Sequence, residues 1–169
     1  MGISLVPSTN PGGMTLLSTT TLSGASTTIS NIPLSYTDLI LVATNVYAAA
    51  ANTINCRFNA DDTSANYSSN ILRTENGTVS GNVNVNNGFI GSCGNQTGNL
   101  TLTSFRIEIP RYSFTENHRI YSTLRGNVGT ERMCITNMSY SSTTEISSIK
   151  LQVDSTTFTA GTVYLYGVR

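Results

Sequence analysis

Residues 105–109 read Phe-Arg-Ile-Glu-Ile, so every second residue is apolar. The same alternation recurs over residues 54–59, 82–86 and 149–154. An alternating pattern is typical of β-strands that bury one face and expose the other. Residues 39–42 read Leu-Ile-Leu-Val without a polar residue, which predicts a strand covered on both faces. Together these stretches predict an all-β chain.

Turn signals separate the alternating stretches. Asn-Gly pairs at 76–77 and 87–88 supply the positive φ that tight hairpin turns need. About ten to twelve short strands fit between residues 14 and 168, and no amphipathic helix of useful length does. We therefore predict an antiparallel β-sandwich, jelly-roll-like, as a single domain over residues 14–169. Residues 1–13 are punctuated by proline and glycine and predict a short extended N-terminal arm.

The composition argues against several classes of function. The 169 residues include nine basic and nine acidic side chains, and charged residues make up only 11% of the chain. Lys150 is the only lysine, so the basic footprint that holds a phosphate backbone is missing and no nucleic-acid partner is expected. No apolar run approaches the roughly 18 residues of a membrane span. The first ten residues also lack the pattern of a secretory signal, so we expect no membrane association.

The residues that could carry catalysis are few. Cys56, Cys93 and Cys134 are an odd number without C-x-x-C spacing, which favours reduced, mostly buried thiols over disulfides or zinc. His118 is the only histidine, and no G-x-S-x-G motif accompanies it. A pair of His118 with Cys93 or Cys134 stays open, but we expect a protein without enzymatic activity and without a cofactor.

A cluster of oxygen-bearing side chains occurs at residues 59–62. Asn59, Asp61 and Asp62 carry the ligand atoms that calcium prefers in a tight loop. The calcium-loop consensus is not met, because no glycine follows and no glutamate closes the loop. Asn and Asp side chains also bond to the backbone and shape turns. We favour a turn between two strands, and whether it binds calcium stays open.

Two segments carry a likeness that composition does not supply. The first reads IPLSYTDLIL over 32–41 and continues to RFNAD at 57–61 and NYS at 66–68. The second reads FTAGTVYLYGV over 158–168. Together they resemble a family of tailed-bacteriophage virion structural proteins. The resemblance implies a β-sandwich displayed on the particle, as a capsid decoration protein or as a tail or fibre module.

The resemblance also implies roles for particular residues, all of them structural. Tyr36 and Leu39 would lie at the start of a core strand. A long turn would be shaped by four residues, Asn59, Asp61, Asn66 and Tyr67. Gly161 and Gly167 would allow bends around the last strand.

These observations lead to an expected function. We expect a non-enzymatic capsid decoration or cement protein that binds and stabilises the phage head shell at the surface of the virion, after synthesis in the host cytoplasm. The expected partners are the chain itself, as a trimer by analogy, and the major capsid protein or another virion protein. The alternative is a tail- or fibre-associated receptor-binding module that recognises a cell-surface glycan.

The candidate contacts lie in two elements, because loops and termini carry contacts on rigid sandwiches. One is the N-terminal arm, and the other is an asparagine-rich loop near residues 82–99. The residues are Gly2, Ile3, Leu5, Pro7 and Pro11 in the arm, and Asn84, Asn86 and Asn87 in the loop.

Overall fold

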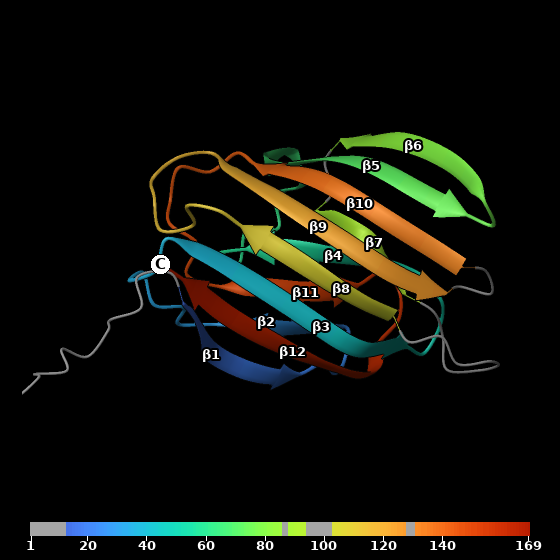
Figure 1. Ribbon diagram of the computed structural model, residues 1–169, viewed down its shortest axis with the longest axis horizontal. Helices are drawn as coiled ribbons and strands as arrows, with labels where there is room; N and C mark the ends of the chain where they lie inside the picture. The colour runs from blue at the N-terminus through green and yellow to red at the C-terminus, as the bar shows by residue number, and fades with distance from the viewer. Residues whose placement is uncertain (1–12, 86–87, 94–102, 128–130) are drawn as a thin grey trace, which may run out of the picture.

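The computed structural model describes residues 13–85, 88–93, 103–127 and 131–169, which form twelve strands and one short 3-10 turn (Figure 1). The elements are β1 (Met14–Thr21), β2 (Ser26–Ile29), β3 (Asp38–Ala48), β4 (Asn52–Phe58), η1 (Ser64–Asn66), β5 (Tyr67–Glu75), β6 (Thr78–Val85), β7 (Phe89–Cys93), β8 (Thr103–Ile109), β9 (His118–Asn127), β10 (Glu131–Tyr140), β11 (Ile149–Val153) and β12 (Phe158–Val168).

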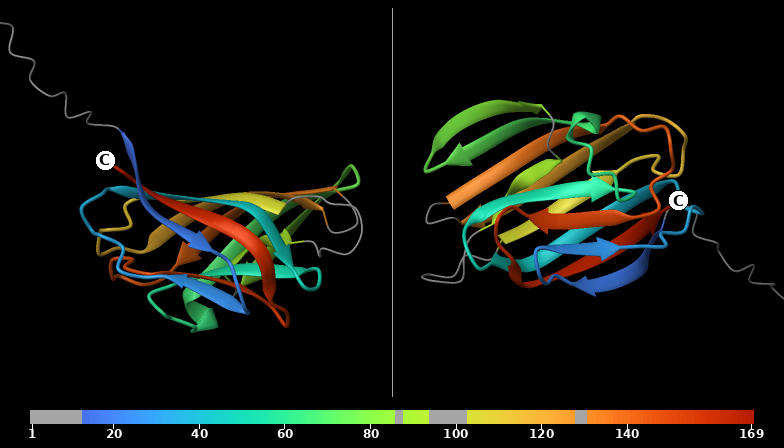
Figure 2. Two further views of the ribbon diagram at one scale, coloured as in Figure 1. Left: turned by 90° about the horizontal axis from the view of Figure 1, so that it is seen from below. Right: turned by 180° about the vertical axis from the view of Figure 1, so that it is seen from behind.

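The strands form two antiparallel sheets. The larger sheet has eight strands in the order β1-β12-β3-β8-β9-β10-β5-β6, and the smaller has four in the order β2-β11-β4-β7. The two sheets lie face to face, and the hairpin of β5 and β6 extends past the smaller sheet (Figures 1 and 2). The predicted all-β antiparallel sandwich is confirmed. β1 begins at Met14, and residues 1–12 of the predicted arm lie outside the described residues.

The alternating sequence places the core between the sheets. Along β8, Phe105, Ile107 and Ile109 are buried, whereas Arg106 and Glu108 are exposed. Along β11, the apolar residues at 149, 151 and 153 are likewise buried. Because both sheets turn their apolar sides inward, one continuous hydrophobic cluster fills the space between them.

The strand β3 differs from its prediction. Leu39 and Leu41 are fully buried, but Ile40 and Val42 are only half-buried on the outer face of the eight-stranded sheet. The expectation that residues 39–42 are covered on both faces is therefore wrong for the single chain. The run is apolar on a side that no other described element of the chain covers.

The asparagine-rich segment carries two expectations, a strand from the alternation over residues 82–86 and a contact loop near residues 82–99. Asn82 and Asn84 belong to the strand β6, which pairs with β5 without a register shift, so the strand is confirmed as far as residue 85 and the loop is wrong at these two positions. Asn76 and Gly77 connect the two strands, each with positive φ (48° and 78°), as a tight hairpin turn requires. Alternating valine and a two-residue turn therefore outweigh the loop preference of asparagine.

Among the residues that the structure describes, no helix has the length and hydropathy that a membrane crossing requires.

Candidate functional site

The turn after β4 is joined to the segment before β11 by one side chain. Asn59, with a φ of 53°, donates from Nδ2 to the carbonyl of Glu145 (2.8 Å). Its Oδ1 accepts from the backbone N–H of Ser147 (2.8 Å) and of Ser148 (3.3 Å). The amide thus satisfies backbone groups that no strand partner reaches.

Asp61 organises the same turn from its other side. Its carboxylate accepts from the N–H of Thr63 (2.9 Å), from Nδ2 of Asn66 (2.7 Å) and from the hydroxyl of Tyr140 (3.2 Å). Burial opposes ionisation of this carboxyl, but the hydrogen bonds from Asn66, Thr63 and Tyr140 outweigh it and hold the pKa of Asp61 below its ordinary value. The carboxylate therefore acts as an acceptor within the turn.

Two stacked tyrosine rings pack beneath the turn, on the side of the hydrophobic core. The rings of Tyr67 and Tyr140 lie 4.8 Å apart, and Phe58 packs against Tyr140 at 5.4 Å. The Tyr67 hydroxyl accepts from the N–H of Phe58 (3.0 Å) and donates to the carbonyl of Asp61 (2.8 Å). Burial raises the pKa of Tyr67 far above its ordinary value. The guanidinium of Arg57 lies 4.5 Å from the centre of the same ring.

Calcium ligation would compete with these internal bonds. Asp61 is engaged by Thr63, Asn66 and Tyr140, and Asp62 forms an ion pair with Lys150. Within the described ranges, no three His, Cys, Asp or Glu side chains come together as a metal site would require. The geometry therefore favours the turn interpretation of this segment.

His118 and the thiol of Cys134 lie apart. His118 is buried, its Nε2 lies 2.9 Å from the carbonyl of Thr144, and it pairs with Tyr140 across the strands. Cys134 lies six positions along β10 from Tyr140, a separation of roughly 20 Å in a strand. Burial raises the pKa of the Cys134 thiol and of the Cys56 thiol, which keeps both protonated. The side chain of Cys93 lies outside the description.

The two predicted glycines sit where a larger residue would collide. A Cβ on Gly167 would lie 2.5 Å from the ring of Tyr36. Gly161 has a φ of 142°, and a Cβ there would lie 2.8 Å from Leu22. Gly161 follows Ala160, at which the pairing of β12 with β3 shifts register, whereas Gly167 gives room for Tyr36. Tyr36 thus packs at the far end of the last strand, close in space to the start of β3.

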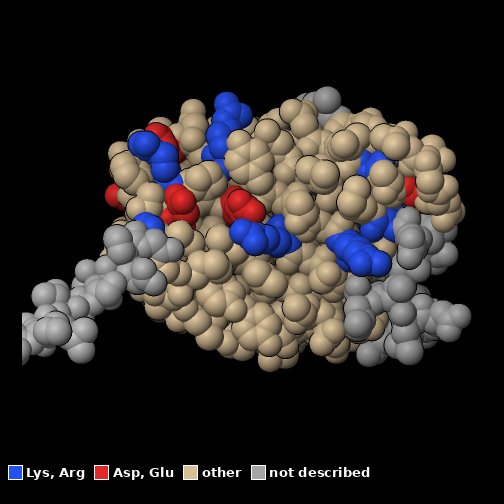
Figure 3. Space-filling model, viewed as in Figure 1, with Lys and Arg blue, Asp and Glu red and all other residues tan. Residues whose placement is uncertain are grey.

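The outer face of the eight-stranded sheet carries most of the exposed large hydrophobic side chains of the described residues. Nine large hydrophobic side chains are exposed within the described part of the chain, and seven of them come from strands of this sheet. Figure 3 shows this face, where charged side chains gather in a band across the middle and at one end while broad uncharged areas flank the band. The seven are Met14, Leu16, Leu72, Val79, Tyr121, Met133 and Ile135.

Five of these side chains form what we call the apolar patch, namely Leu72, Val79, Tyr121, Met133 and Ile135 on β5, β6, β9 and β10. The register places Leu72 directly opposite Ile135. Contiguous exposed apolar surface of this kind marks interaction sites on soluble proteins. The patch is the strongest candidate functional feature of the described surface.

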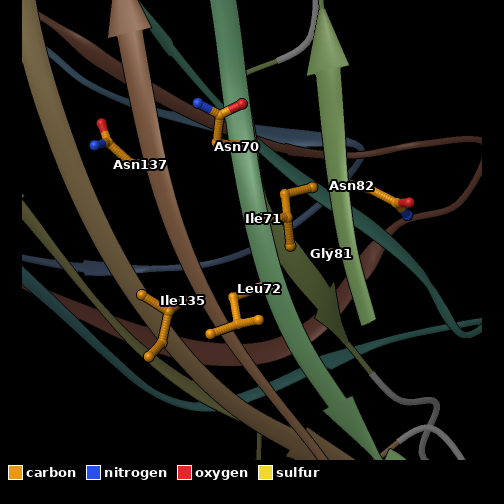
Figure 4. Close-up of a pocket in the computed structure, with 7 residues that line it drawn as sticks. All are labelled: Asn70, Ile71, Leu72, Gly81, Asn82, Ile135 and Asn137. Carbon is orange, nitrogen blue, oxygen red and sulfur yellow. The ribbon is translucent and has the colours of Figure 1, made fainter. Parts of the chain in front are cut away.

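A shallow hollow opens within the patch (Figure 4). Leu72 and Ile135 lie opposite each other in it, and Asn70 and Asn137 form the next pair on the same face of the sheet. The hollow exists partly because Gly81 has no side chain between its neighbours on β6. Its lining residues are Asn70, Ile71, Leu72, Gly81, Asn82, Ile135 and Asn137.

The predicted partner contacts are only partly placed. Asn84 lies in β6 opposite Ser69, at the edge of the eight-stranded sheet. Asn86 and Asn87, and the arm residues Gly2, Ile3, Leu5, Pro7 and Pro11, lie outside the described residues. The apolar patch was not predicted. Its signal was the run Met133-Cys134-Ile135, which is apolar at both parities and so predicts a strand with two apolar faces.

The chain matches no protein family model, no curated protein and no solved structure.

Proposed function

We propose that this chain is a non-enzymatic virion structural protein, a decoration or cement protein of a tailed-phage head. The observation that carries the proposal is the exposed apolar outer face of the eight-stranded sheet. Seven large hydrophobic side chains there remain in water in the single chain. A protein held on a particle buries such a face against its neighbours, which stabilises both.

The low charge of the chain suits this role. With nine basic and nine acidic residues, its net charge is zero, so copies crowd on a shell without strong repulsion. A specific contact needs about 1,600 Å² of total buried surface. The outer face of an eight-stranded sheet supplies a broad surface of this kind, and the buried core behind it keeps that surface rigid.

We further propose that the sandwich is a jelly roll. The strands β1, β12, β3 and β8 follow one another in the larger sheet, and β2, β11, β4 and β7 make the smaller one. In both sheets an early strand lies beside a late one, as the two interleaved Greek keys of a jelly roll require. On this view the pairs β5–β6 and β9–β10 are additions that widen the larger sheet and provide the apolar patch.

The predicted contact residues fit the same proposal. β1 lies at one edge of the larger sheet and β6 at the other. Residues 1–12 precede β1 in the chain, and Asn84 belongs to β6. In our proposal these edges contact the major capsid protein or another virion protein, on the particle surface, after synthesis in the host cytoplasm.

A second candidate function rests on the hollow in the apolar patch. Asn70 and Asn137 stand beside the apolar side chains of Leu72 and Ile135 (Figure 4). Amide groups next to an apolar surface are able to bind the hydroxyls and the ring face of a sugar. In this alternative the chain is a tail-associated module that recognises a cell-surface glycan.

The deciding experiment locates the protein on particles produced from the genome that encodes it. An antibody against the purified chain, detected by immunogold electron microscopy, is expected to label heads. Label confined to tails would replace the proposal by the receptor-binding alternative, to be pursued with a glycan-binding screen. Particles that carry neither label nor the chain by mass spectrometry would overturn both.

A further inference from the structure

The strand β6 is an unprotected sheet edge. It pairs with β5 alone, over eight residues without a register shift. Its sequence, TVSGNVNV, contains no charged residue and no proline. Natural proteins protect exposed edges with charges, prolines, bulges or short strands, because an open edge pairs with other chains.

The other three edge strands of the described fold carry such protection. β2 has four residues and β7 has five. β1 has eight residues, but its pairing with β12 shifts register between Leu16 and Ser18. A bulge of this kind twists an edge away from partners. β6 is thus both long and regular, and it lies at the far side of the sheet beyond the four-stranded layer (Figures 1 and 2).

The hairpin geometry shows which backbone groups of β6 point outward. A two-residue turn makes Glu75 and Thr78 a hydrogen-bonded pair, and bonded pairs then alternate along the strand. Ser80 and Asn82 therefore bond to β5. The N–H and C=O groups of Val79, Gly81 and Val83 point away from β5, toward the open edge.

No steric contact within the described chain requires a glycine at position 81. A Cβ placed on it would meet only the carbonyl oxygen of Ile71, at 3.6 Å, which is an ordinary contact. Glycine within a strand weakens it and often marks a close approach of another backbone. Gly81 lies midway along the open edge and lines the hollow in the apolar patch.

We propose that two copies of this chain associate by pairing β6 with β6 in antiparallel orientation, about a two-fold axis through Gly81. The segment from Val79 to Val83 reads valine, polar, glycine, polar, valine, so its pattern is the same in both directions. Pairing about Gly81 sets Val79 opposite Val83 of the second copy and Ser80 opposite its Asn82. β6 itself contributes no charged side chain to this contact.

This contact joins the two eight-stranded sheets edge to edge. The apolar patches of both copies, with Leu72 and Ile135 close to the edge, then form one continuous surface. A two-fold contact uses the same strand on both copies and closes on itself. The inference concerns the free chain in solution, so it stands or falls separately from the proposed attachment to a particle.

The test places matched charges on the axis. Gly81→Lys and Gly81→Glu each add a side chain to a site with room for it. By analytical ultracentrifugation at micromolar concentration, the unmodified chain is expected to form dimers and each variant to be monomeric, because like charges meet at the axis. An equimolar mixture of the two variants is expected to restore dimers, since lysine then faces glutamate. Thr19→Lys, exposed on the opposite edge strand, is the matched control and leaves the dimer intact.

The outcomes separate the alternatives. Circular dichroism checks that each variant keeps its β-structure. A Gly81 variant that does not is replaced by Val79→Lys, which sets a charge opposite Val83 of the second copy and is expected to give monomers. Mixing it with Val79→Glu is expected not to restore dimers, because position 79 faces position 83 and the two charges do not meet. A monomeric unmodified chain overturns the inference. So does a trimer, since three copies about a three-fold axis do not bring position 81 against itself, and so does a dimer that Gly81→Lys leaves intact.

Discussion

Asn59 acts over a long distance in the sequence, because its side chain bonds to the carbonyl of Glu145, 86 positions later. Next to it, Asp61 accepts three hydrogen bonds within the turn. The sequence predicted that these residues shape the turn. It did not predict their hydrogen-bond partners, because the segment around residue 145 has no recognisable sequence pattern.

Asp61 gives the turn a dependence on pH. Its pKa is lowered in the folded chain, so its contribution to stability is present above the pKa of about 3.9 that an unfolded Asp has. The contribution is lost as the pH falls through the lower folded value. We expect Asp61→Asn to destabilise the chain near neutral pH and the difference to vanish in acid. Urea unfolding of both proteins across this range measures it, and a difference that is constant with pH would contradict the assignment.

Gly167 is expected to reject even a methyl group. Gly167→Ala brings a Cβ to 2.5 Å from the ring of Tyr36, and relief of such overpacking costs about 1–3 kcal/mol. Thermal unfolding is expected to show a midpoint several degrees lower. The matched control is Gly81→Ala, also in a strand of the same sheet, where the Cβ makes an ordinary contact and the midpoint is unchanged or higher. Equal effects of the two variants would refute the steric argument.

At the scale of the strand, two isoleucine-to-alanine substitutions compare the inner and outer faces of the large sheet. Ile107 in β8 is fully buried, whereas Ile135 in β10 is 45% exposed. We expect Ile107→Ala to cost about 2–5 kcal/mol of unfolding free energy. Ile135→Ala is expected to cost less than about 1 kcal/mol, because its side chain is half in water already. Chemical denaturation compares the two, and a large loss for Ile135→Ala would mean that the outer face is covered.

The same contrast explains how much of the fold could be predicted from sequence. Alternation identified strands such as 105–109 and 149–153, because burial of one face imposes a period of two. The placing of β11 between β2 and β4 could not be predicted, since non-local pairing leaves no local pattern. The alternation with valine correctly predicted a strand at Asn82 and Asn84, whereas their placement in a contact loop, which followed the turn preference of asparagine, was wrong. The apolar patch was missed because alternating strands were expected to expose a polar face.

At the scale of the whole molecule, the segment before β1 is expected to contribute to attachment but not to folding. Removing residues 1–12 leaves every described strand intact, because β1 begins at Met14. We expect the shortened chain to unfold at the same temperature as the full chain and to cosediment more weakly with particles that lack the protein. Normal attachment, or loss of the fold, would overturn the role given to this segment.

The stacked rings of Tyr67 and Tyr140 give the molecule an intrinsic spectroscopic signal. The chain has no tryptophan, so absorption and circular dichroism near 280 nm arise from its tyrosines. Two buried rings held 4.8 Å apart couple their transitions, so the turn that they support supplies a signal of its own. Local unfolding of this turn would change the circular dichroism near 280 nm, while the far-ultraviolet circular dichroism of the β-sheets would stay unchanged. The protein thus carries an intrinsic spectroscopic probe of the turn after β4, and no label is needed.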